Sequence, residues 1–162
     1  MTAPHRVHVY EKAWMWGGVA QIAIFIAIIL WSAGAQGMFP PSRVETIDPQ
    51  QVMADPRFAT PGVTTADDGT VVVTAVARVF MFMPAEIRVP AHREVAIRIT
   101  SPDVIHGFAV VGTNVNVMVV PGYVTEARTT FDKPGEYLVV CNEYCGTAHH
   151  VMSGKLIVEE AP

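Results

Sequence analysis

The segment between residues 141 and 152 concentrates side chains that bind soft metals. Cys141 and Cys145 are followed by His149 and Met152, and His106 lies upstream. Thiolate, imidazole and thioether groups suit copper or zinc and not magnesium or calcium. Methionine discriminates between the two metals, because it is a poor zinc ligand but a common weak axial ligand of copper in electron-transfer sites. The segment therefore predicts a copper site.

A disulfide between the two cysteines is the alternative interpretation. In an oxidising compartment, two cysteines in one chain would ordinarily pair. Cys141 and Cys145 are four residues apart in a short loop, where pairing needs a particular backbone geometry. The histidine and methionine at fixed offsets favour a metal instead.

The elements that must position these ligands follow from composition and pattern. The 162 residues are enough for one domain and an additional element. Hydrophobic residues make up 51% and charged residues 16%, which is apolar for a soluble protein and indicates a membrane segment. The net charge of −4 gives no reason to expect nucleic acid as a partner.

An N-terminal membrane anchor is predicted within residues 1–36. No charge occurs from residue 13 to residue 42, and residues 19–31 are apolar except for Gln21. Trp14 and Trp31 would lie about 26 Å apart along a helix, close to the thickness of a bilayer's hydrocarbon core. Aromatic residues at both ends are expected of a membrane span.

A cleaved signal peptide is the competing interpretation of this anchor. The sequence Ala33-Gly34-Ala35 resembles a cleavage site, but the apolar core is longer than a signal peptide requires, which favours a retained anchor. Arg6 and Lys12 precede the helix, whereas Arg43 follows it beside acidic residues. This bias predicts a single-pass protein with a cytoplasmic N-terminus.

Residues 37–70 are predicted to be a linker and residues 71–162 a β domain. Phe39-Pro40-Pro41 stops the anchor helix, Asp48-Pro49 begins a short helix over 49–54, and Asp68-Gly69 is a tight turn. Short strands rich in Val, Ile and Thr, separated by Pro, Gly and Asn, then predict an antiparallel sandwich or Greek-key barrel. The expected strands span residues 71–78, 86–89, 95–100, 108–111, 115–119, 125–131, 136–140 and 155–158.

The ligand pattern resembles the copper-A domain of cytochrome c oxidase subunit II. That family has a distant His and then Cys-x-Glu/Gln-x-Cys-x-x-x-His-x-x-Met. The flanking residues 101–108 and 134–137 resemble the single-helix subunit II of ba3-type oxidases, and the likeness covers residues 72–159 and the helix before them. Every motif position is filled here, by His106, Cys141, Glu143, Cys145, His149 and Met152.

The resemblance implies a mainly β protein, a cupredoxin-like Greek-key barrel preceded by one transmembrane helix. It also implies a dinuclear copper centre, copper-A, in which Cys141 and Cys145 bridge both ions. By the same resemblance, His106 and His149 each bind one ion, and Met152 is a weak axial ligand on the ion of His106.

Glu143 has two roles in this resemblance. Its backbone carbonyl serves the second copper, so its side chain is free. In many family members this acid helps to bind magnesium at the interface with the catalytic subunit, and a carboxylate suits such a hard cation. The ba3-type chains tend to have Gln instead, so magnesium binding and a hydrogen bond to the partner subunit both stay open.

The function that the resemblance implies is electron transfer within a membrane enzyme. Electrons would pass from a cytochrome c or small copper protein to the copper, and then to haem in catalytic subunit I, with the copper domain on the outer face. The alternative is the copper-A subunit of a nitric oxide reductase; nitrous oxide reductases normally carry a fused propeller domain. A mononuclear blue-copper carrier would need one cysteine, and a quinol oxidase subunit II lacks the copper ligands.

The point where electrons arrive is predicted near Phe80 and Phe82. The family often uses an exposed Trp above the copper, but all three Trp of this chain lie in the membrane segment. Residues 78–84 match that region, and their Phe and Met side chains predict an apolar docking patch with weak electrostatic steering. The alternative is that alternate side chains of this run fill the barrel.

The remaining polar residues near the motif have minor expected roles. We expect Asp103 to hydrogen-bond within the His106 loop. His150 lies beside a ligand but off the motif, so it should face solvent or support the site. No role is assigned to His5, His8 or His92.

Overall fold

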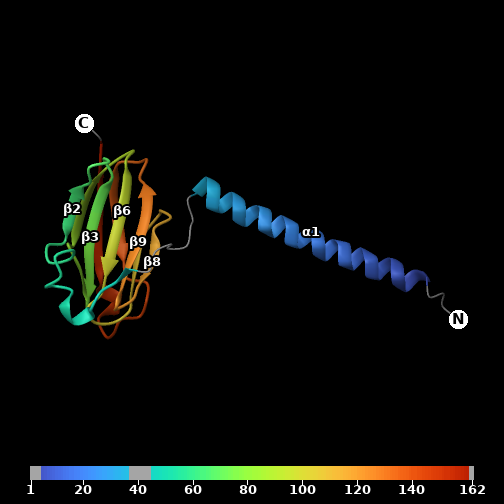
Figure 1. Cartoon of the computed structure of the whole chain (residues 1–162), viewed down its shortest axis with the longest axis horizontal. Helices are drawn as coiled ribbons and strands as arrows, with labels where there is room; N and C mark the ends of the chain where they lie inside the picture. The colour runs from blue at the N-terminus through green and yellow to red at the C-terminus, as the bar shows by residue number, and fades with distance from the viewer. Residues whose placement is uncertain (1–4, 37–44, 161–162) are drawn as a thin grey trace. The chain divides into compact units, whose positions relative to one another are not determined.

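The computed structural model describes residues 5–36 and 45–160 and divides the chain into two compact units. One unit is the N-terminal helix and the other is a β domain (Figure 1). The predicted stop of the anchor at Phe39-Pro40-Pro41 lies outside the described residues, as does Arg43.

The first unit is a helix, α1, which spans His5–Gln36. Its segment His8–Ala35 is long and apolar enough to cross a membrane. Large apolar side chains are exposed all around this segment, including Trp14 and Trp31 near its two ends. A helix that is apolar on every side needs an apolar environment around it, and a membrane provides one.

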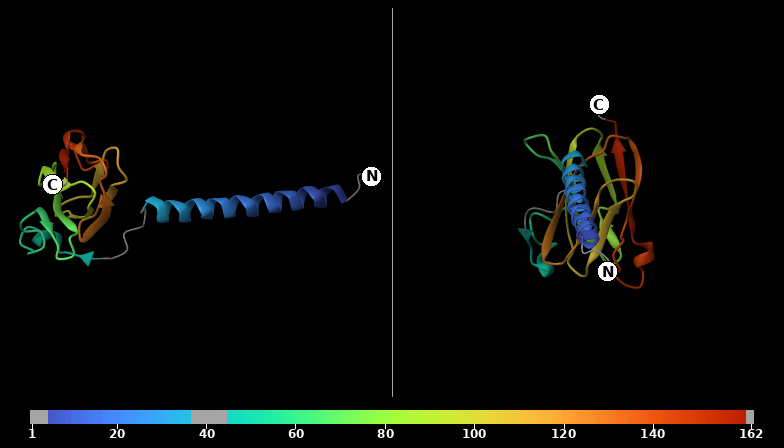
Figure 2. Two further views of the ribbon diagram at one scale, coloured as in Figure 1. Left: turned by 90° about the horizontal axis from the view of Figure 1, so that it is seen from above. Right: turned by 90° about the vertical axis from the view of Figure 1, so that its right-hand side faces the viewer.

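The second unit is a sandwich of two sheets (Figures 1 and 2). The first sheet contains, in spatial order, β1 (Glu45–Thr46), β9 (Tyr123–Thr130), β6 (Glu94–Thr100), β3 (Val71–Arg78) and β2 (Gly62–Thr65), with β4 (Met81–Met83) also paired to β3. The second contains β5 (Glu86–Pro90), β11 (Ser153–Glu159), β10 (Gly135–Val140), β7 (His106–Val110) and β8 (Asn116–Val119).

All eight predicted strands are present, and their ends agree with the prediction to within two residues. The predicted antiparallel pairing is not complete, since β3 pairs with β6 and β5 with β11 in parallel. Parallel neighbours need a crossover, and between β3 and β6 the chain forms β4 and then β5 in the opposite sheet. The short strands β1, β2 and β4 were not predicted, because runs of two to four residues carry little periodic signal.

Alternate side chains of both sheets fill the space between them. On β5, and on β3 as far as Ala75, the buried positions follow the period of two that a half-buried strand requires. Val76 of β3 breaks the alternation because it is buried in a second apolar cluster. Phe82 and Phe108 meet edge to face in this core, with ring centroids 5.4 Å apart. His106 is fully buried at the start of β7, within the same packed interior.

The segment from residue 45 to residue 70 is part of the β domain, so the predicted linker over 37–70 is wrong for these residues. Its strands β1 and β2 pair with β9 and β3. The predicted helix is only a 3-10 turn, Pro49–Gln51, where the Asp48 side chain accepts a hydrogen bond from the Gln50 N–H. A second apolar cluster holds the segment against the sheet, formed by Ile47, Val52, Phe58, Val76 and Val124.

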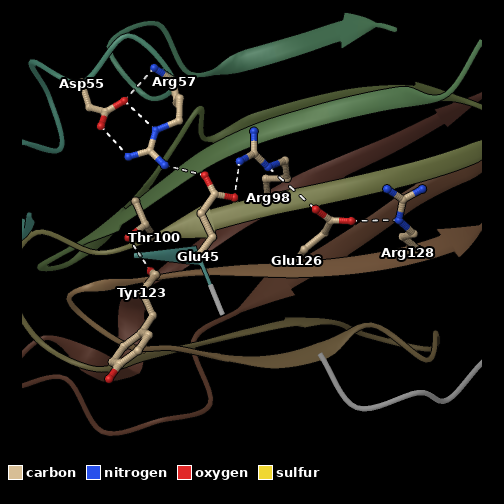
Figure 3. A network of polar contacts seen from close by, with 8 residues as sticks. All are labelled: Glu45, Asp55, Arg57, Arg98, Thr100, Tyr123, Glu126 and Arg128. Carbon is tan, nitrogen blue, oxygen red and sulfur yellow. Dashed lines mark hydrogen bonds and ion pairs between the residues drawn. The ribbon is translucent and has the colours of Figure 1, made fainter. Parts of the chain in front are cut away.

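Ion pairs connect this segment to the first sheet (Figure 3). Arg57 contacts Asp55 at 2.6 Å and Glu45 at 2.5 Å, and Glu45 also accepts a hydrogen bond from Arg98 of β6 at 2.6 Å. Arg98 in turn lies 5.9 Å from the ring centre of Phe58. Partial burial raises the pKa of Glu45, but the hydrogen bonds from Arg98 and Arg57 outweigh it, so this pKa lies below its usual value.

Candidate metal centre

The predicted ligands come from two loops at one end of the sandwich. His106 is the first residue of β7, and Cys141 directly follows β10. These strands are antiparallel neighbours, with Val140 opposite Ala109. The end of one strand therefore lies beside the start of the other, which brings His106 to the loop between β10 and β11.

The side chains of this loop converge on one another and on His106. The two sulfurs of Cys141 and Cys145 are 3.8 Å apart. Nδ1 of His106 is 3.9 Å from the Cys141 sulfur, and Nδ1 of His149 is 3.6 Å from the Cys145 sulfur. The Met152 thioether lies 3.6 Å from the Cys145 sulfur. Two imidazole nitrogens and a thioether thus surround a pair of thiols.

The Glu143 carbonyl also faces this cluster, because its oxygen lies 3.2 Å from the Cys141 sulfur. The two cysteines are free, and their separation far exceeds the roughly 2.05 Å of a disulfide bond. The structure therefore provides thiols for a metal and not a disulfide.

The chemistry of the donor set fits copper. His106, Cys141 and Cys145 are buried, and their donor atoms lie within 4.8 Å of one another. Burial, and after it the neighbouring Cys141, raise the pKa of the Cys145 thiol to about 11. A soft cation would replace these protons, since thiolates are the metal-binding form.

The loop before β7 fixes the orientation of His106. Oδ1 of Asp103 accepts a hydrogen bond of 2.8 Å from Nε2 of His106. Its Oδ2 accepts another of 2.9 Å from the Val79 N–H, in the turn between β3 and β4. The expectation that Asp103 hydrogen-bonds within this loop is confirmed, and Nδ1 is left for the cluster.

Comparison with known proteins identifies this arrangement. A family model described as cytochrome c oxidase subunit II, periplasmic domain, matches residues 66–161. The chain belongs to the cytochrome c oxidase subunit II family. Subunit 2 of cytochrome c oxidase from Thermus thermophilus is 41% identical, over 99% of this chain and 100% of that protein.

Solved structures agree with the assignment to the cytochrome c oxidase subunit II family. A chain of a haem-copper terminal oxidase dimer superimposes with a TM-score of 0.76 at 35% identity, over 93% of this chain and 99% of that one. The periplasmic domain of subunit II from Bradyrhizobium japonicum gives a TM-score of 0.52 at 20% identity, over 62% and 88% of the two chains, and supports the fold alone. The β sandwich is thus the expected cupredoxin-like domain of this family, preceded by one apolar helix.

Two glycines allow the ligand loops of this family member to come close. A Cβ on Gly107 would lie 2.8 Å from the backbone nitrogen of Asn142, so the residue after His106 must be small for the residue after Cys141 to pack there. Gly146 has a φ of +130°, which disfavours side chains, and a Cβ there would lie 3.0 Å from the Phe80 ring. Both loops therefore depend on close approaches to a glycine that the ligand motif alone does not show.

The two predicted docking aromatics have different environments. Phe82 is 2% exposed and packs on Phe108, so the prediction that its ring is at the surface is wrong. Strand alternation turns it into the core, as the alternative interpretation held. Phe80 is half-buried and lies against Gly146 of the ligand loop.

Among the residues that sequence reasoning missed, Tyr144 is the most exposed. It stands between the two cysteines, and its ring centroid is 5.8 Å from that of His149. The motif treats its position as variable, so only the structure shows this contact. His150 is exposed, as expected, and His8 and His92 lie in other parts of the chain, beside Glu11 and Asp132.

Proposed function

We propose that this chain is the electron-accepting subunit of a haem-copper terminal oxidase. The observation that carries the proposal is the convergence of His106, Cys141, Cys145, His149 and Met152 at one end of a cupredoxin-like domain. When bound there, a dinuclear copper centre would take up one electron and share it between two ions. The cysteines would bridge the ions, with the Glu143 carbonyl as a further ligand.

The protein's contribution is to hold these ligands in a fixed, dry arrangement. Cys141, Cys145 and Met152 belong to the same packed core as Phe82 and Phe108. Ligands that cannot move between oxidation states keep the reorganisation of the site small, which favours electron transfer over other copper chemistry. His149 is the histidine that reaches toward the surface, being only half-buried.

The electron donor would dock on the apolar end of the domain that contains the ligand loops. Phe80 contributes a half-buried ring to this end. Its chain neighbours Val79 and Met81 are exposed, as are three apolar side chains of the two ligand loops, Val104, Ile105 and Val151. Asp103 and Glu143 are the acidic residues of the two ligand loops. A surface with so little charge supports docking by a cytochrome c or small copper protein with weak dependence on ionic strength.

The acceptor would be haem in a separate catalytic subunit within the membrane. The long apolar helix α1 supports membrane anchoring, and the positive residues before it support a cytoplasmic N-terminus with the copper domain on the outer face. The Glu143 side chain is half-buried, and it would not bind copper because the backbone carbonyl does so. It could therefore bind a magnesium ion at the subunit interface or form a hydrogen bond to the partner subunit.

Purification of the tagged chain from its native membrane tests this function. We expect a haem-containing subunit to copurify, and we expect the complex to oxidise reduced cytochrome c with consumption of oxygen. Cys141→Ser should abolish this turnover, whereas Glu143→Gln should keep the copper spectrum because only the backbone carbonyl binds the metal. Consumption of nitric oxide and not oxygen would assign the chain to a nitric oxide reductase.

A further inference from the structure

We propose that Tyr144 is the surface contact through which the donor's electron reaches the ligand His149. The inference rests on the proposed function, since it names the place on that site where the donor must dock. It differs from docking over Phe80, because Tyr144 touches a predicted ligand ring directly.

The geometry forms a short path from solvent to sulfur. The rings of Tyr144 and His149 have centroids 5.8 Å apart with an interplanar angle of 58°, within the range of aromatic contact. Nδ1 of His149 lies 3.6 Å from the Cys145 sulfur. Electron transfer weakens steeply with distance, so a donor that contacts Tyr144 is separated from the ligand set by a single ring.

The exposure of Tyr144 is unusual for this domain. It is 78% exposed, whereas Phe80 is half-buried and Phe82 is in the core. Residues 45–160 contain no Trp. Among these residues, Tyr144 combines strong exposure with ring contact to a predicted ligand; Tyr123 is 48% exposed and makes no such contact. A ring held in water contributes little to folding, but exposed tyrosines are common anchors of binding interfaces.

The surroundings of Tyr144 suit an uncharged, transient contact. Val151, in the same loop, is 63% exposed, and His150 is exposed beside it. Glu143 is half-buried and is the one acidic residue between positions 141 and 152. The partner chemistry that fits is the apolar rim around an exposed haem edge. In the transfer, a ferrous haem loses one electron and becomes ferric, and the copper centre is reduced by that one electron. Tyr144 neither gains nor loses a proton.

A kinetic comparison of variants tests the proposal in the full, copper-loaded chain in detergent. Reduction by ferrous mitochondrial cytochrome c would be followed by stopped flow. We expect Tyr144→Leu to lower the bimolecular rate at least fivefold with an unchanged copper absorption spectrum and potential. Tyr144→Phe should keep the rate within twofold, because the ring remains. Tyr123→Leu, the matched loss of an exposed tyrosine without ligand contact, should also stay within twofold.

A second readout needs no copper. The chain contains four tyrosines, so fluorotyrosine labelling gives four fluorine resonances, which Tyr→Phe variants assign. Addition of ferric cytochrome c, whose iron is paramagnetic, should broaden the Tyr144 resonance of the copper-free chain more than those of Tyr10 and Tyr137.

The outcomes separate the two proposals. If the wild-type chain is not reduced by cytochrome c, the proposed function with this donor class fails. If the wild type is reduced and Tyr144→Leu is equally fast, or Tyr123→Leu is equally slow, only the role of Tyr144 is overturned. A changed copper spectrum in Tyr144→Leu, or a Tyr144 resonance that does not broaden, would likewise overturn it.

Discussion

Asp103 and His106 are joined by a 2.8 Å hydrogen bond between a carboxylate oxygen and Nε2, on the side of the ring opposite Nδ1 and the Cys141 sulfur. The same carboxylate accepts the Val79 N–H. The buried histidine is therefore fixed in tautomer and rotation by a group that does not itself face the cluster. Carboxylates that orient a ligand histidine in this way commonly contribute to metal affinity.

The first prediction concerns this carboxylate. Asp103→Asn should lower copper affinity by about tenfold to a hundredfold, because the amide accepts more weakly and allows His106 to turn. Competition with a copper chelator measures the change. Asp132→Asn is the control. It removes a carboxylate that is far more exposed than that of Asp103, and it should leave the copper affinity unchanged. Equal affinities for Asp103→Asn and the wild type would show that packing alone orients the ring.

The second prediction concerns Gly107. Gly107→Ala should destabilise the domain by about 1–3 kcal/mol, as overpacking of a tight contact does, because the new Cβ would meet the Asn142 backbone. It should also weaken copper binding, since Asn142 adjoins Cys141. Gly62→Ala is the matched control, because nothing lies within 4 Å of its added Cβ. Thermal unfolding with and without copper measures both effects, and an undisturbed Gly107→Ala protein would contradict the close approach.

The third prediction concerns the segment that covers the first sheet. Phe58 is fully buried in the second apolar cluster, so Phe58→Ala should lower the free energy of unfolding by about 3–5 kcal/mol. Met53→Ala, at a 39% exposed neighbour, should cost much less. Denaturant unfolding of the full chain in detergent measures the difference. If both variants lower the free energy of unfolding equally, Phe58 is not packed against the first sheet.

The fourth prediction concerns acid stability. Hydrogen bonds from Arg57 lower the pKa of Asp55 from 3.8 to about 2. A carboxyl whose folded pKa is depressed stabilises the fold above its unfolded pKa and loses that effect as pH falls through the folded value. The difference in Tm between the wild type and Asp55→Asn should thus be constant above about pH 5, shrink as the pH falls toward 2, and be lost below the folded pKa. A difference that is undiminished at pH 2 would contradict the ion pair; Asp67→Asn controls for the loss of one exposed carboxylate.

The sequence predicted the parts of this protein that rest on repeated patterns. Short runs rich in Val, Ile and Thr between turn residues identified the strands, and the fixed offsets from Cys141 to Met152 identified the ligand loop. Positions that depend on contacts between residues far apart in the chain were not predicted, because no local sequence pattern encodes such contacts. Phe58 and Val52 pack on a sheet that the chain forms later, and the contact of Tyr144 with His149 arises only when the loop is folded.

Phe80 and Phe82, the two aromatic residues predicted to form the docking patch, show the same limit of prediction from local patterns. Phe80 and Phe82 are two residues apart, so alternation alone would place both on one face. In the structure Phe80 lies in the turn between β3 and β4, before the strand begins, and only Phe82 follows the strand into the core. An unpredicted turn therefore separated two side chains that the sequence treated together.

The copper content and the spin-resonance spectrum of the purified chain test whether it holds a dinuclear copper centre. We expect two copper ions per chain and, in the oxidised protein, a spectrum of one electron delocalised over two copper nuclei, because both thiols of the 3.8 Å pair would bridge the ions. Cys141→Ser and Cys145→Ser should each remove that spectrum. One copper per chain with the spectrum of a single nucleus would contradict a dinuclear centre.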